Sequence, residues 1–118
     1  MMRAADPREW RGRDVVDEAG HRIGMLEAIY VDIATDEPAM ATVRTGLPTR
    51  HRLRFVPLQD ATLGPDYLKV AYAKALVQSA PSIGTDDILP AEDEEAVFQH
   101  YGLPYETGKD AVRRLARR

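Results

Sequence analysis

The chain of 118 residues contains no cysteine and no long apolar run. The absence of cysteine excludes disulfides, thiolate metal sites and cysteine nucleophiles. The apolar runs are too short for a transmembrane helix, and residues 1–13 lack the apolar core of a signal peptide. We therefore expect a cytoplasmic protein without a membrane segment.

Residues that commonly carry catalysis are also scarce. The chain has two serines, Ser79 and Ser82, which flank Pro81, and three histidines at positions 21, 51 and 100. No histidine pairs with another at a familiar metal-ligand spacing, and no glycine-rich phosphate or nucleotide motif is present. We predict that the protein is not an enzyme and has no cofactor and no metal.

What the chain does contain is an ordinary globular composition, 44% hydrophobic and 30% charged, with a net charge of −3. This length suits one domain. We divide the chain into an N-terminal arm over residues 1–11, a domain over 12–105 and a basic tail over 106–118. The tail is expected to be flexible, with weak contact to RNA or an acidic partner as the alternative.

Short β-strand patterns fill the first two thirds of the chain. They are predicted over residues 15–16, 21–33, 40–45, 52–58, 61–63 and 67–70. Gly24 interrupts the apolar alternation of the second strand, which predicts a bulge or bend there. Pro57 cannot donate to a strand ladder and is expected at a strand end or edge.

Two helices are predicted after the strands, over residues 73–80 and 90–101. Apolar residues there recur at helical spacing, and Pro81 follows the first helix. The acidic residues at positions 92–95 suit the N-terminal turns of the second helix. Gly102 followed by Leu103 predicts a Schellman-type end.

Two features could contact a partner. Trp10 is expected to pack on the edge of the domain, with an exposed anchor as the alternative. A basic cluster could bind phosphate, RNA or an acidic protein surface, and the alternative is a charged sheet face that prevents aggregation. The cluster comprises Arg44, Arg50, His51, Arg52 and Arg54.

The order of these motifs resembles PRC-barrel domains, over roughly residues 12–105. The resemblance is carried by the opening Gly12 to Asp32 with Gly20 and Ile23-Gly24, by Ala41 to Gly46, by Phe55-Val56-Pro57-Leu58 with Asp60-Ala61, by Val70 to Pro81, and by His100-Tyr101-Gly102-Leu103. It implies a small, highly bent antiparallel β-barrel with two short C-terminal helices, in which Gly24, Asp32, Pro57 and Gly102 are fold-making residues. It implies no family-wide catalytic residues. Relatives include the cytoplasmic domain of the photosynthetic reaction-centre H subunit and the C-terminal domain of a ribosome-maturation factor.

Three functions remain open from the sequence. The first is a non-catalytic adaptor or assembly module that binds protein and forms a homodimer, since an open barrel leaves edges for a second copy. The second is an RNA- or ribosome-associated factor that uses the cluster from Arg44 to Arg54. The third is an enzyme or small-molecule binder with a pocket formed by Tyr30, His51 and Tyr67.

Overall fold

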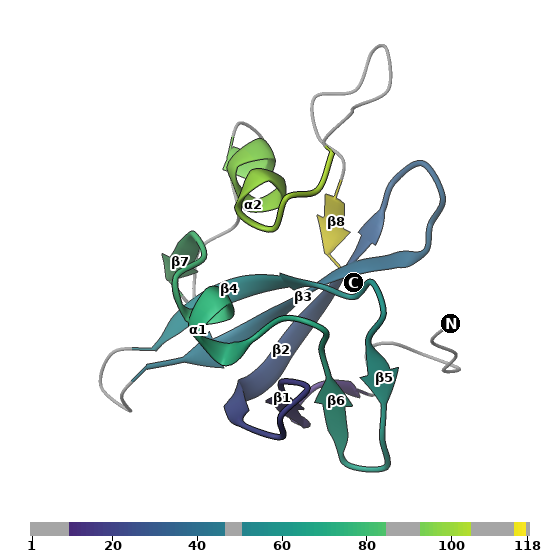
Figure 1. Cartoon of the computed structure of the whole chain (residues 1–118). Helices are drawn as coiled ribbons and strands as arrows, with labels where there is room; N and C mark the ends of the chain where they lie inside the picture. The colour runs from purple at the N-terminus through teal and green to yellow at the C-terminus, as the bar shows by residue number, and fades with distance from the viewer. Residues whose placement is uncertain (1–9, 47–50, 85–92, 105–114, 118) are drawn as a thin grey trace.

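A bent sheet of eight strands is the main element of the computed structural model, which describes residues 10–46, 51–84, 93–104 and 115–117 (Figure 1). The strand order is β5-β6-β1-β2-β3-β4-β7, and β8 pairs with β2 beside this path. The strands are β1 (Asp14–Val16), β2 (Arg22–Asp32), β3 (Pro38–Thr45), β4 (Arg52–Pro57), β5 (Thr62–Leu63), β6 (Tyr67–Lys69), β7 (Ser82–Gly84) and β8 (Leu115–Arg117). The chain is thus mainly β, and the six strands predicted from the sequence are confirmed.

Two features of the pairing bear on the expected antiparallel barrel, one at the β1–β6 pair and one at the ends of the strand path. Strands β1 and β6 run parallel, with Val15 opposite Leu68, whereas the other pairs are antiparallel. Among the described strands the path also ends at β5 and β7 without joining them. Strand β6 thus joins the edge of β1 after the chain has passed through the β2–β3–β4 meander.

Strand β2 bends next to Gly24, as predicted. The register with β1 shifts by one residue there, because Val15 lies opposite Gly24 and Val16 lies opposite Arg22. A Cβ atom at Gly24 would overlap the backbone carbonyl of Arg44 on β3. Only glycine therefore allows β3 to approach this closely. A second irregularity, at Glu27, adds to the curvature.

Two other fold-making residues predicted from the sequence hold strand ends. Pro57 is the last residue of β4 and is buried opposite Met40. Asp32 ends β2, where its carboxylate accepts a hydrogen bond from the backbone N–H of Ala34 at 2.8 Å. These contacts place the turns that carry the chain out of the sheet.

The two short helices are α1 (Lys74–Gln78) and α2 (Glu94–His100). After α2, Gly102 has a φ of 70°, its N–H bonds the carbonyl of Gln99, and the N–H of Leu103 bonds that of Phe98. This is the predicted Schellman end. Pro90, expected at the start of the second helix, lies outside the described residues. Glu94 and Glu95 lie in the first turn of α2, as predicted for this acidic stretch, and the side chain of Glu94 is fully buried.

The core joins both helices to the sheet in one cluster. Val77 of α1 and Val97, Phe98 and Tyr101 in and after α2 are buried with the β2–β3–β4 side chains. The Tyr101 hydroxyl donates to the carbonyl of Phe55 at 2.5 Å. This hydrogen bond ties the segment that follows α2 to the middle of β4.

Strand β8 lies in the predicted flexible tail. Leu115 is buried opposite Asp32, and its N–H donates to the Glu94 carboxylate at 3.3 Å. Leu115–Arg117 therefore belong to the sheet, and the expectation of a flexible tail does not hold for them. Residues 106–114 and 118 of the tail, and residues 1–9 of the arm, lie outside the described residues.

Candidate functional site

Trp10 is part of the core. Its side chain is 2% exposed, and it packs with the hydrophobic cluster. Packing against the domain is therefore confirmed, and the alternative of an exposed anchor for a partner is wrong. The indole N–H is buried and finds no acceptor among the described residues.

The arginine cluster is divided between the two faces of the sheet. Arg44 on β3 lies opposite Leu53 on β4, whereas Arg54 lies opposite Val43. Directly opposed residues share a face and successive residues alternate, so Arg44 lies on one face and Arg54 on the other. The cluster in the sequence is thus not one patch in space.

Each described arginine of the cluster also has a partner within the chain. Arg44 forms a salt bridge with Glu27, with an N–O distance of 2.7 Å. Arg54 donates to the Ala80 carbonyl at 2.5 Å, and Arg52 donates to the hydroxyl and carbonyl of Ser82 at 3.1 and 3.3 Å. Arg52 and Arg54 therefore hold the segment after α1 against β4. Arg50 lies outside the described residues.

The structure gives no support to the pocket predicted from Tyr30, His51 and Tyr67. Tyr30 is 4% exposed, and its ring packs on Phe55 with centroids 5.0 Å apart. Tyr67 lies in β6, which does not pair with the strand that carries Tyr30. None of the three residues lines the hollow described below.

A serine and a histidine do meet, although the sequence indicated no base for Ser79. The Ser79 hydroxyl lies 3.4 Å from Nε2 of His100. Both groups also contact the Leu76 carbonyl, the hydroxyl at 2.9 Å and Nε2 at 2.8 Å. Because a carbonyl accepts only, Nε2 carries a proton in this arrangement and cannot accept one from Ser79. Both side chains thus bind the carbonyl of Leu76 near the end of α1.

Asp17 links the β1–β2 turn to the start of α1. Its carboxylate accepts hydrogen bonds from the backbone N–H groups of Ala19, His21 and Lys74, at 2.9 to 3.1 Å. Desolvation raises the pKa of Asp17, but the N–H donors of His21 and Lys74 outweigh it and hold the pKa below its usual value. The Asp17 side chain thus serves its own turn and also caps a helix that lacks a cap of its own.

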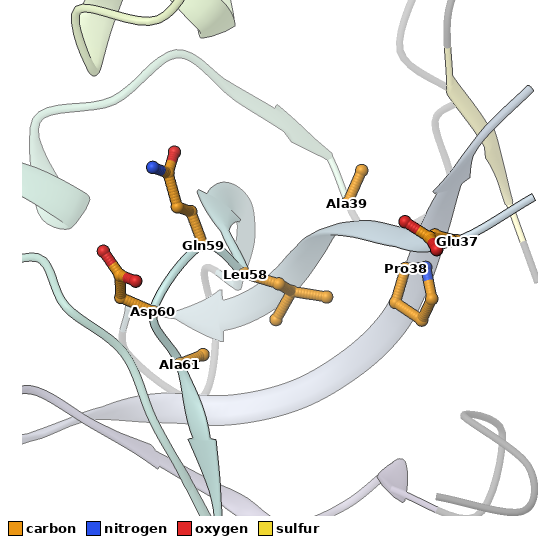
Figure 2. A pocket seen from close by; sticks show the side chains of 7 residues that line it. All are labelled: Glu37, Pro38, Ala39, Leu58, Gln59, Asp60 and Ala61. Atoms are coloured by element: carbon orange, nitrogen blue, oxygen red, sulfur yellow. The ribbon is translucent and has the colours of Figure 1, made fainter. Parts of the chain in front are cut away.

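A surface hollow of about 440 Å³ lies where the start of β3 meets the chain that follows β4. Figure 2 shows Leu58 between the side chains of Glu37 and Asp60, with Ala39 and Ala61 close by. Leu58 is buried, the alanines are half-buried, and the two carboxylates are exposed. No motif in the sequence indicates this hollow, because its two segments are distant in the chain and only strand pairing brings them together.

Other site chemistry is limited in the described ranges. They contain no group of three or more histidine or acidic side chains placed to hold a metal ion. They also contain no helix with the length and apolar character needed to cross a bilayer.

The comparisons with known proteins agree with the fold. The model of the PRC-barrel domain family matches residues 2–77, which is more than half of the chain. The chain therefore belongs to the PRC-barrel domain family. A search of curated proteins finds no match.

Proposed function

We propose that this chain is a non-catalytic docking and assembly module of the PRC-barrel type, which binds protein and forms a homodimer in the cytoplasm. Family membership supports a module of this kind. The cysteine-free composition suits a reducing compartment. The curvature of the sheet supports the highly bent barrel expected for the family.

The observation that carries self-association is the outer edge of β5. Gly64 donates to the carbonyl of Tyr67 at 2.9 Å, which makes these two residues a hydrogen-bonded pair. Because such pairs alternate along an antiparallel ladder, the N–H and C=O of Leu63 point away from β6. No described strand pairs with that side. A second copy could satisfy these groups by adding a strand, in a symmetric contact.

The RNA-associated alternative loses its main support in the structure. Three of its four proposed arginines have partners inside the chain, and Arg44 lies on the opposite face from Arg54. A phosphate backbone would have to compete with those contacts. We therefore do not adopt this function.

Sedimentation velocity of the full chain from low to high micromolar concentration tests the proposal. We expect a species of twice the 13.2 kDa chain mass at the higher concentrations. Leu63→Pro removes the outward N–H and should shift the equilibrium to monomer, whereas Leu63→Val keeps that N–H and should behave like the parent. A monomer at every concentration would contradict self-association. Equal behaviour of the two variants would exclude the β5 edge.

A further inference from the structure

We propose that the hollow between Glu37 and Asp60 docks an extended cationic segment of a partner protein, in which arginine or lysine stands two residues before and two residues after an apolar residue. This inference rests on the proposed function as a protein-docking module, and it names the surface and the chemistry of the partner. It concerns a different surface from the β5 edge.

The apolar part of the hollow is built by strand pairing. The N–H of Leu58 donates to the carbonyl of Ala39 at 2.9 Å, which extends the contact of β3 with the chain beyond β4. Leu58 is 6% exposed and forms the apolar centre, while Pro38, Ala39 and Ala61 have small side chains that leave space above it. This shape suits one apolar side chain of a partner.

The charged part of the hollow has one sign. Its lining residues include two carboxylates, Glu37 and Asp60, and no cation. Neither carboxylate forms an ion pair within the part of the chain that the structure describes. Figure 2 shows the two carboxylates on opposite sides of Leu58. Charge complementarity therefore favours a segment with a cation on either side of its apolar residue.

The backbone turn at Asp60 leaves the hollow open. Asp60 has a φ of 61°, in the left-handed region, and Ala61 donates back to the carbonyl of Leu58 at 3.0 Å. This turn directs the chain from β4 towards β5 and leaves Gln59 and Asp60 exposed at the rim. An extended segment could contact the rim and the apolar centre together, because alternate side chains of a strand point the same way.

Titration of the ¹⁵N-labelled full chain with a synthetic capped peptide, in which arginines stand two residues before and two residues after one leucine, tests the proposal. We expect amide shifts to concentrate at Ala39, Leu58, Asp60 and Ala61. A matched peptide with glutamate in place of arginine should not bind. Shifts centred elsewhere, or equal binding of both peptides, would overturn the proposal.

Variants that remove the charges of Glu37 and Asp60 test whether these carboxylates bind the peptide. Glu37→Gln with Asp60→Asn should weaken peptide binding about tenfold, since it removes two exposed charge contacts. Asparagine tolerates the φ of Asp60, so the turn is kept. The matched control is Glu18→Gln with Asp66→Asn, which removes the same charge from exposed positions outside the hollow. Equal affinity of the two double variants would overturn the proposal.

A variant that fills the hollow, together with a measurement of the oligomeric state, completes the test. Ala61→Arg places a long cation in the hollow and should abolish peptide binding while leaving sedimentation unchanged. Unimpaired binding of the peptide to this variant would contradict the site. A protein that forms the dimer but does not bind the peptide would refute only peptide binding at the hollow. A monomer that binds the peptide would refute only the homodimer.

Discussion

The basic residues of β3 and β4 and the acidic residues of the hollow form two contrasting charged regions. Arg44, Arg52 and Arg54 are close in the sequence, yet they lie on two faces and bond within the chain. Glu37 and Asp60 are distant in the sequence, yet they line one hollow without ion pairs to described residues.

Strand register explains the difference. The pairing of Met40 with Pro57 brings the start of β3 to the end of β4, so the turns that flank these ends become neighbours. The same pairing places Arg44 on one face of the sheet and Arg52 and Arg54 on the other. The segment after α1 accepts hydrogen bonds from Arg52 and Arg54. A charge cluster therefore indicates a binding surface only when the register places its members together and leaves them unpaired.

The largest effect should come from the tryptophan first grouped with the arginines as a partner-binding residue. Trp10→Ala should lower the free energy of unfolding by about 3–5 kcal/mol, because it empties a buried site. Trp10→Phe should cost less, since the indole N–H has no acceptor among the described residues. Urea unfolding measures both. A loss within experimental error for Trp10→Ala would contradict its place in the core.

The next largest loss of stability is expected at Arg54. Arg54→Met keeps an apolar stem but leaves the Ala80 carbonyl without its donor, which should cost about 1.5–3 kcal/mol of stability. Arg52 is exposed and makes longer hydrogen bonds, so Arg52→Met should cost less than about 1 kcal/mol. Urea unfolding of the pair gives the comparison. Equal costs would show that the two arginines do not differ as their contacts indicate.

Alkaline pH tests the environment of Tyr101, a side chain that Arg54 influences. Burial raises the pKa of Tyr101, the neighbouring Tyr72 raises it further, and Arg54 opposes them. Tyrosine in the unfolded chain ionises near pH 10. Its contribution to stability is therefore complete below about pH 10 and declines above it, because only the unfolded chain then releases the proton.

Tyr101→Phe should cost about 1–2 kcal/mol at neutral pH, since the Phe55 carbonyl loses its donor. It should also reduce the fall in stability above about pH 10. Urea unfolding at several pH values measures how steeply the free energy of unfolding falls with pH in the variant and in the parent. A slope unchanged from the parent would contradict the raised pKa.

The smallest effect on stability is expected at the hollow. Glu37→Gln with Asp60→Asn should change the free energy of unfolding by less than about 0.5 kcal/mol, because both carboxylates are exposed and neither forms an ion pair with a described residue. A loss comparable with that of Arg54→Met would show a structural role and remove the contrast between the two regions.

Much of the fold was predictable because local chemistry specifies it. The bend at Gly24, the strand end at Pro57 and the helix end at Gly102 each depend on what one residue type can or cannot do. Leu53 and Phe55, in the strand predicted over residues 52–58, are both buried on β4.

The parts that were missed depend on distant contacts. Strand β7 is three residues long, and β8 has a single buried residue, Leu115, in a basic stretch. Neither offers a periodic pattern. The hollow likewise forms where the start of β3 meets the chain that follows β4, and the local sequence of Glu37 or Asp60 does not indicate that proximity.

The single carboxylate of Asp17 has a consequence for the variation of related sequences. It accepts hydrogen bonds from its own turn and from Lys74, 57 residues further along the chain. Substitutions at position 17 should therefore be tolerated only with compensating changes at the start of α1, such as a serine or aspartate at position 73 that could cap the helix itself. We expect positions 17 and 73 to covary in an alignment, although their side chains need not touch.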